Sequence, residues 1–244
     1  MTINRPLIVI PARLRSSRLK NKLLLPLHGR PLIHWVCSRI QSSELADFVI
    51  ATDSEDIKEY CYQNNFHCLL TPDHFENGTE RVAYIANKKS EYDFFVNVQA
   101  DEPLLNTSLV ENVIHGFKAG AFNVAVSKLS ESYINNTNEV KAALSFGNRI
   151  RFASRSNVPF GRDEAASCYK IHGVYSYDIE TLNRFLDAPV GPLENAEKVE
   201  QLRCIEHDIP IYAVPSECTE KSVDTQADYE YMASLPRSKF EEYL

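Results

Sequence analysis

The residues with the clearest capacity for chemistry are a run of cations near the N-terminus. Five of them lie within residues 13–22: Arg13, Arg15, Arg18, Lys20 and Lys22. Residues 1–43 carry eight basic side chains and no acidic one, whereas the whole chain of 244 residues has 26 Lys and Arg against 33 Asp and Glu, a net charge of -7. An acidic protein with one cationic segment is suited to binding one anionic ligand, and this balance argues against a nucleic-acid-binding face.

Carboxylates follow two of the apolar runs farther along the chain. Asp53 comes directly after residues 48–52, and Asp101 and Glu102 lie in the turn after residues 94–98. A cationic loop beside a carboxylate pair suits phosphoryl chemistry, because Arg and Lys bind phosphate oxygens while carboxylates hold Mg²⁺. The segment after the first apolar run is neither G-x-G-x-x-G nor G-x-x-x-x-G-K-[ST]. This disfavours dehydrogenases and P-loop NTPases.

Buried strands must position these groups. The apolar runs 7–10, 48–52 and 94–98, with a weaker one at 66–70, predict strands buried on both faces, and helical patterns at 31–40, 54–62, 79–88 and 108–117 lie between them. This alternation predicts an α/β fold with a mostly parallel sheet and helices on both faces, whose ligands bind beyond the carboxyl ends of the strands. The second half is less regular, with strands expected at 123–127, 139–144, 150–153, 173–177 and 212–214 and helices at 195–206 and 225–235. We predict one domain over residues 1–244 with a subdomain inserted at about 120–215.

Composition excludes several other classes of protein. The chain contains no apolar run near the roughly 20 residues that a membrane helix needs, and the apolar stretch 7–10 is too short for a signal peptide. We therefore expect a cytoplasmic protein without membrane insertion. The six cysteines form no C-x-x-C pair and have no histidine at metal-ligand spacing. We expect reduced thiols and no zinc site.

Several short motifs occur in an order typical of one enzyme family. Ile10-Pro11-Ala12-Arg13, with Ser17-Arg18-Leu19 and Lys22, resembles the IPAR…STRLPGK signature of sugar nucleotidyltransferases. Asn77-Gly78-Thr79-Glu80-Arg81 resembles SGTER, and residues 96–103 resemble VNVQGDEP. The further matching segments are 29–33, 51–53, 154–159, 173–177, 192–194, 200–203 and 223–225. From about residue 7 to 235 the chain thus resembles the 3-deoxy-manno-octulosonate cytidylyltransferase (CMP-Kdo synthetase) family of lipopolysaccharide assembly.

This resemblance implies a fold and a reaction. The fold would be a Rossmann-like sheet of the nucleotide-diphospho-sugar transferase type, and the inserted subdomain would serve sugar binding and dimerisation. The reaction would transfer CMP from CTP to the anomeric C2 hydroxyl of 3-deoxy-manno-octulosonate (Kdo), by in-line displacement of pyrophosphate with the help of Mg²⁺. Positioning and charge neutralisation dominate such a transfer. The partners would be CTP, a 3-deoxy-ulosonic acid and a second copy of the chain.

The resemblance also implies roles for individual residues. The triphosphate and the leaving pyrophosphate would bind Arg13, Arg18 and Lys22, while Mg²⁺ would bind Asp101 and Asp224. The residues implied on the nucleotide side are Gly78, Arg81 and Gln99, and those implied for the sugar acid are Arg155, Tyr175, Glu200 and Gln201. Arg15 and Lys20 match no family cation, so we expect them on the solvated surface.

Three departures from the family pattern leave alternatives open. Lys20-Asn21 replaces Pro-Gly in the phosphate loop, which predicts a loop of different shape, and Ala100 replaces a glycine. His172 lies one position from the family's histidine, so either a bulge restores it to the sugar or Ile171 takes that place, the option we favour. The sugar could then be 8-amino-3,8-dideoxy-manno-octulosonate, which residues 158–163 also suggest, or another sugar acid. A non-catalytic anion- or nucleotide-binding module is the alternative of another class.

Overall fold

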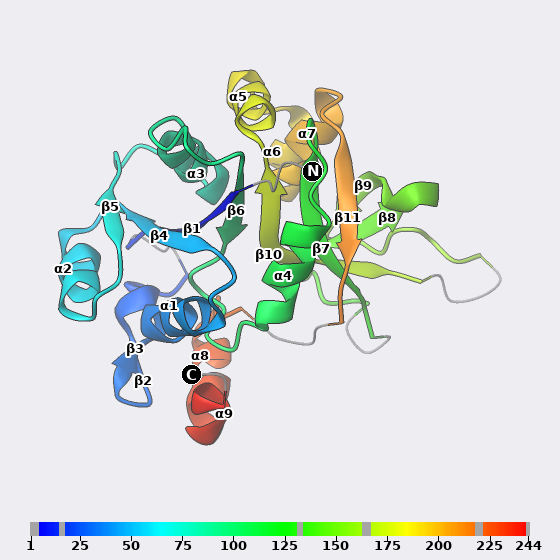
Figure 1. Ribbon diagram of the computed structural model, residues 1–244. Helices are drawn as coiled ribbons and strands as arrows, with labels where there is room; N and C mark the ends of the chain where they lie inside the picture. The colour runs from blue at the N-terminus through cyan, green and yellow to red at the C-terminus, as the bar shows by residue number, and fades with distance from the viewer. Residues whose placement is uncertain (1–4, 15–17, 131–133, 163–166, 218–221, 243–244) are drawn as a thin grey trace. The chain divides into compact units, whose positions relative to one another are not determined.

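The computed structural model describes residues 5–14, 18–130, 134–162, 167–217 and 222–242. The chain forms two compact units. Unit 1 comprises Met1–Val110 and Thr219–Leu244, and unit 2 comprises Glu111–Cys218. Figure 1 shows the elements of both. The roles expected for residues 120–215, sugar binding and dimerisation, stay a prediction.

The centre of unit 1 is a parallel sheet whose strands occur in the order β6-β1-β4-β5 (Figure 1). The strands are β1 (Pro6–Ala12), β4 (Asp47–Thr52), β5 (Cys68–Leu70) and β6 (Phe94–Val98). In β1 every residue from Leu7 onward is buried, as is every residue of β6, which explains why both strands are mostly apolar in the sequence. All of their pairings with one another and with β4 are parallel. The predicted sheet of mostly parallel strands, with helices around it, is confirmed.

Helices make up most of the rest of unit 1, and the first three of them connect its strands. They are α1 (Leu32–Ser43), α2 (Glu55–Gln63), α3 (Gly78–Ala86), α4 (Thr107–His115), α8 (Gln226–Ser234) and α9 (Ser238–Glu241), while the short elements are η1 (Lys22–Leu24), β2 (Pro26–Leu27) and β3 (Arg30–Pro31). The N-termini of α2 and α3 follow ordinary capping chemistry, because Ser54 accepts a hydrogen bond from the backbone of Ile57 and Asn77 accepts one from that of Glu80. The unit boundary falls within α4.

The C-terminal segment belongs to unit 1 through specific contacts. The buried Arg39 of α1 donates hydrogen bonds to the carbonyls of Lys239 and Phe240 at 2.9 and 3.3 Å, and to that of Pro103 at 3.2 Å. Phe240 also packs its ring against Trp35 at 5.3 Å between centroids. Arg39 therefore joins α1 to α9 and to the turn that follows Asp101.

Unit 2 contains a mixed sheet in which β7 is flanked by an antiparallel and a parallel neighbour. Strand β7 (Phe122–Lys128) pairs antiparallel with β10 (Tyr169–Tyr177) and parallel with β11 (Ile211–Pro215). Strand β8 (Lys141–Leu144) pairs antiparallel with both β10 and β9 (Ile150–Ser154). The remaining elements are η3 (Phe146–Asn148), α5 (Ile179–Asp187), α6 (Pro192–Glu197) and α7 (Gln201–Glu206).

One predicted helix of unit 2 is wrong in its extent. Residues 195–206 were expected to form a single helix, but the structure has two, α6 and α7. Lys198 adopts a left-handed conformation with φ 56° and ends α6, its backbone N–H bonding to the carbonyl of Glu194. Such a terminus is typical of glycine, so a lysine at this position does not indicate a helix end in the sequence.

No helix in the described part of the chain is both long and apolar enough to cross a membrane. The five cysteines that the structure describes are free thiols, four of them buried, as expected for reduced cysteines. Cys218 lies outside the described residues.

Candidate active site

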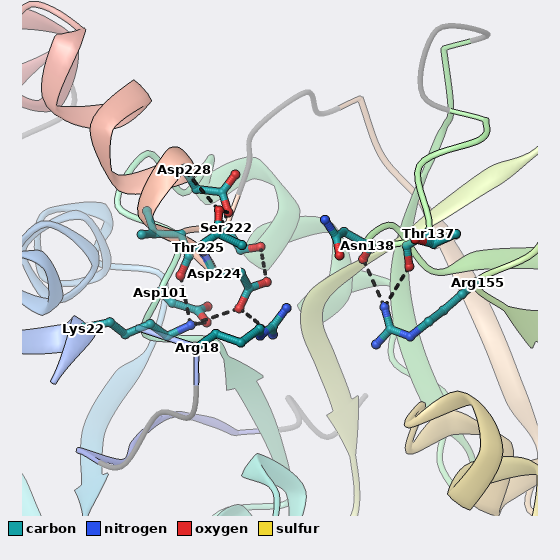
Figure 2. Close-up of polar contacts among 11 residues, drawn as sticks. Arg18, Lys22, Asp101, Thr137, Asn138, Arg155, Ser222, Asp224, Thr225 and Asp228 are labelled. Carbon is teal, nitrogen blue, oxygen red and sulfur yellow. Dashed lines mark hydrogen bonds and ion pairs between the residues drawn. The ribbon is translucent and has the colours of Figure 1, made fainter. Parts of the chain in front are cut away.

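The cations and carboxylates of unit 1 converge on the side chain of Lys22. Its Nζ donates hydrogen bonds to Asp101 Oδ2 at 2.6 Å, to Asp224 Oδ1 at 3.1 Å and to the carbonyl of Val223 at 2.9 Å. Arg18 reaches the same Asp224 oxygen at 2.9 Å. Figure 2 shows these four charged side chains pointing toward one another. Segments that lie 79 and 202 residues from Lys22 are thereby joined in one charged cluster.

The parallel sheet explains this convergence. Lys22 comes after β1 and Asp101 comes after β6, and the two strands pair in parallel, so both residues emerge at the same edge of the sheet. Asp224 reaches the cluster from the C-terminal segment, where the backbone N–H of Val223 donates to the carbonyl of Asp101 at 2.9 Å. The Asp224 carboxylate is held further by a hydrogen bond from Ser222 Oγ at 3.2 Å.

Two of the departures from the family pattern fit the local backbone. Asn21 has φ 53°, in the left-handed region, and directly precedes η1. Asparagine tolerates this region better than most residues, so this turn does not require a glycine at position 21. Ala100 is not among the residues with positive φ, so a β-carbon causes no backbone strain there. Lys20 is exposed, as expected, whereas Arg15 lies outside the described residues.

The charges in the cluster stabilise one another in their ionised forms. Burial acts to lower the pKa of Lys22, but the charges and hydrogen bonds of Asp101 and Asp224 outweigh it, and the pKa is raised. Burial acts to raise the pKa of Asp224, but Lys22 and Arg18 outweigh it, and the pKa is lowered. Lys22 and Asp224 thus stabilise one another in their charged forms.

The carboxylates have the chemistry of a magnesium site. Asp101 and Asp224 already direct oxygen atoms at one shared cation, the ammonium of Lys22. Among the described residues there is no group of three or more His, Cys, Asp or Glu side chains that could hold a metal. Mg²⁺ is commonly bound by one or two carboxylates together with substrate phosphates, and the residues present therefore fit this ion.

The residues predicted for the nucleotide side surround the start of α3. A β-carbon on Gly78 would lie 3.1 Å from Pro11 Cγ, 3.3 Å from Gln99 Nε2 and 3.4 Å from Asn97 Nδ2, so only glycine fits without displacing a neighbour. Arg81 is 2% exposed, and its guanidinium binds Asp53 at 3.0 Å as well as Thr71. Through these contacts Arg81 joins the loops that follow β4 and β5.

Arg13 lies at the end of β1 and points to the neighbouring loop. Its Nη1 donates to the carbonyl of Glu76 at 2.9 Å, and the side chain is exposed. The three predicted phosphate-binding cations thus differ in setting. Lys22 is 14% exposed and fixed by three acceptors, whereas Arg18 is 56% exposed and has room to reorient toward a ligand.

A second cluster in unit 2 is organised around Arg155, just after β9. Its Nε donates to the carbonyl of Glu197 at 2.8 Å, and its Nη1 donates to the carbonyls of Thr137 and Asn138 at 3.0 and 3.3 Å (Figure 2). The pKa of Glu197 is lowered by a hydrogen bond from Ser154 Oγ and by one from the backbone N–H of Arg155. Sequence reasoning missed Glu197, because no motif marks it.

The other residues predicted for the sugar acid also lie in unit 2. Glu200 and Gln201 are at the start of α7, which packs against β9, the strand that precedes Arg155. Tyr175 is on β10 and is 8% exposed. Strand β9 thus packs against α7 and leads directly to Arg155. Tyr175 lies on another strand of the same sheet.

His172 is a buried residue of β10. It is 3% exposed, and its Nε2 lies 2.7 Å from Ser127 Oγ on β7. Burial and the nearby charge of Lys170 lower its pKa to about 3, so the ring is neutral. The pairing of β10 with β7 has an irregular register between Ile171 and Tyr175, which accords with the bulge that was the less favoured of the two alternatives. Which of Ile171 and His172 takes the place of the family histidine stays a prediction.

Comparison with known proteins identifies the family. A model of the cytidylyltransferase family matches residues 7–211. The 3-deoxy-manno-octulosonate cytidylyltransferase of Koribacter versatilis is 33% identical over 240 residues, covering 96% of this chain and 91% of that protein. The 3-deoxy-manno-octulosonate cytidylyltransferase 2 of Hydrogenovibrio crunogenus is 36% identical over 239 residues, covering 93% and 96%.

A solved structure agrees over the same length. CMP:2-keto-3-deoxy-manno-octonic acid synthetase complexed with CTP has a TM-score of 0.88 and 30% sequence identity, and the match covers 95% of this chain and 98% of that one. These likenesses span nearly the entire sequence, and they include both the loop with Lys22 and the turn with Asp101. The protein belongs to the cytidylyltransferase family of nucleotidyltransferases.

Proposed function

We propose that this enzyme transfers CMP from CTP to the anomeric hydroxyl of Kdo and releases pyrophosphate, as a cytoplasmic step of lipopolysaccharide biosynthesis. The observation that carries the proposal is the convergence of Lys22 and Arg18 with Asp101 and Asp224 at the carboxyl ends of parallel strands. The relatives named above support CTP and Kdo as the substrates.

The phosphate chemistry is assigned to the cluster in unit 1. Arg13, Arg18 and Lys22 bind the triphosphate and neutralise the charge that develops on the departing pyrophosphate. Nucleotidyltransferases generally use a divalent metal, and we propose Mg²⁺ held by Asp101 and Asp224. When bound, it would reduce the negative charge on the α-phosphate. The C2 hydroxyl of the sugar attacks the α-phosphorus in line with the leaving oxygen, so the protein acts mainly by positioning.

The nucleotide and the sugar acid are assigned to separate sets of residues. Gly78, Arg81 and Gln99 form the nucleotide side. Arg155, Tyr175, Glu200 and Gln201 form the sugar-acid side. The planar guanidinium of Arg155 suits a carboxylate, which would replace the carbonyls of Thr137 and Asn138 as its acceptor. We also propose that residues 120–215, which lie within unit 2, are the sugar-binding and dimerisation part of a single nucleotidyltransferase domain, and that the enzyme is a homodimer.

Pyrophosphate release tests the proposal. The enzyme is incubated with Mg²⁺ and each of the four ribonucleoside triphosphates, with and without Kdo, 8-amino-3,8-dideoxy-manno-octulosonate or a sialic acid. We expect release with CTP and Kdo, and none without a sugar acid. Release with the 8-amino sugar but not with Kdo would favour the 8-amino sugar as the substrate. The one-position shift of His172 in the sequence and the resemblance of residues 158–163 also indicate that sugar. Nucleotide binding without turnover would contradict catalysis and favour a binding module.

A further inference from the structure

A buried carboxamide in the middle of β6 has no role in the chemistry described above. Asn97 is 0% exposed, and within the described chain neither its Oδ1 nor its Nδ2 has a hydrogen-bond partner. Its neighbours on β6, Val96 and Val98, are buried and apolar. An apolar residue at this position would avoid the desolvation cost that an unpaired carboxamide carries. A buried polar group of this kind calls for a specific explanation.

The surroundings of Asn97 point to the nucleotide side of the site. Its Nδ2 and the Nε2 of Gln99 lie 3.4 and 3.3 Å from the same point, where a β-carbon on Gly78 would be. Residues two apart on an extended chain direct their side chains to the same face, so the two carboxamides lie side by side at the start of α3. Pro11, at the end of β1, is 3.1 Å from that point. The side chains of Asn97 and Gln99 thus both approach Gly78 at the start of α3.

The chemistry of a carboxamide explains why such a neighbour matters. A carboxamide offers one acceptor and one donor group. Cytosine presents an amino donor at C4 beside an acceptor at N3, whereas uracil presents an acceptor at C4 beside a donor at N3. A glutamine side chain therefore matches cytosine in one orientation and uracil in the flipped one. It distinguishes the two bases only if a second group holds it in one orientation.

We infer that Asn97 is a positioning residue that holds the Gln99 carboxamide in the orientation that matches cytosine, and thereby sets the preference for CTP over UTP. The inference rests on the proposed function, because it takes a pyrimidine nucleotide as the ligand. Asn97 itself does not touch the nucleotide. In this proposal the Asn97 carboxamide hydrogen-bonds to that of Gln99 when Gln99 binds the base.

Selectivity is the readout that separates positioning from a structural role. Asn97→Leu removes both polar atoms from the buried position, and Asn97→Ala serves if leucine does not fit. In the full-length enzyme we expect the ratio of kcat/KM for CTP to that for UTP to fall about tenfold, the effect of one hydrogen bond. The change should lie in KM for CTP, with kcat nearly unchanged. The midpoint of thermal unfolding should not fall for a variant whose new side chain fits the buried position, because the carboxamide that it replaces was unpaired.

Two further variants complete the experiment. Thr181→Val is a matched control, since the Thr181 hydroxyl on α5 is also buried and unpaired among the described residues, and its removal should leave the ratio unchanged. Gln99→Met tests whether Asn97 acts through Gln99. In that background, Asn97→Leu should have no further effect on the ratio of kcat/KM for CTP to that for UTP. An unchanged ratio in Asn97→Leu and Asn97→Ala would overturn the inference, and so would an equal effect with and without Gln99.

Measurements of nucleotide binding separate a failure of this inference from a failure of the proposed function. Calorimetric titration of the same variants with CTP and with UTP gives the ratio of the two Kd values without any turnover. If the unaltered enzyme binds CTP more tightly than UTP but releases no pyrophosphate with any sugar acid, the proposed function is wrong and the Kd ratio still decides the inference. If it binds the two nucleotides equally or not at all, the inference is wrong.

Discussion

Replacing Lys22 with methionine removes the cation that joins the two carboxylates. Lys22 Nζ makes charge-assisted contacts with Asp101 at 2.6 Å and Asp224 at 3.1 Å. Hydrogen bonds to charged groups contribute about 1.5–3 kcal/mol each, and the low end applies because the three side chains are 14%, 19% and 29% exposed. We therefore expect Lys22→Met to lower the free energy of unfolding by about 2–4 kcal/mol at pH 7.

The effect on catalysis should be larger than the effect on folding alone. Loss of one preorganised group that stabilises developing negative charge typically lowers kcat by about 10²–10³, so we expect kcat/KM for CTP to fall by at least that factor. The variant also leaves Asp101 and Asp224 without their shared cation. Mg²⁺ should consequently raise the thermal midpoint of Lys22→Met more than that of the unaltered enzyme, because Lys22 no longer competes for the same oxygens.

The assays are steady-state pyrophosphate release and urea unfolding, each with and without Mg²⁺. Lys58→Met is the matched control, since Lys58 pairs with Glu55 on the surface of α2 at 3.2 Å and is 45% exposed. An exposed pair of this kind contributes about 0.5 kcal/mol at most, so its loss should leave activity unchanged. A Lys22→Met enzyme with kcat/KM within about threefold of the original would refute the role given to this cation.

Three further predictions concern other residues of the two clusters. Because the pKa of Asp224 is lowered in the folded state, its contribution to stability is present above the unfolded pKa of about 3.9 and is lost as the pH falls through the lower folded value. Asp224→Asn should therefore reduce the free energy of unfolding at pH 7 more than at pH 3, measured by urea titration, and an equal loss at both pH values would contradict this. Arg155→Lys should raise KM for the sugar acid by about tenfold and leave KM for CTP unchanged, because the bidentate geometry is lost while the charge remains; initial rates with each substrate varied test this, and a change in KM for CTP alone would count against it. Gly78→Ala places a β-carbon 3.1 Å from Pro11 Cγ and 3.3 Å from Gln99 Nε2, so calorimetry should show weaker CTP binding, and unchanged affinity would show that the start of α3 is not part of the nucleotide site.

The elements that are buried on both faces could be predicted from the sequence alone. Residues 7–10 and, apart from Asn97, residues 94–98 are apolar because β1 and β6 have no solvent-facing side, and this signal is local in the sequence. The parallel arrangement then predicts that side chains after the two strands come together. Lys22 and Asp101 do so, at 2.6 Å.

Features that depend on tertiary partners could not be predicted in this way. Lys198 breaks the expected helix at 195–206 through a left-handed conformation that its residue type does not favour. Glu197 is held by Ser154 and by the backbone of Arg155, so its role depends on contacts between α6 and β9 rather than on a motif. Asn97 belongs to the segment 96–103 that resembles VNVQGDEP, but only the structure reveals that its amide is buried without a hydrogen-bond partner among the described residues.

The most direct test of the central claim is the mass balance of a reaction that contains CTP, Kdo and Mg²⁺, followed by phosphorus NMR. The account predicts that pyrophosphate and a new phosphodiester of CMP with the sugar appear in equal amounts, and that Asp101→Asn folds normally but forms both far more slowly. Pyrophosphate without a sugar phosphodiester would contradict transfer to the sugar. Unchanged turnover by Asp101→Asn would contradict the site itself.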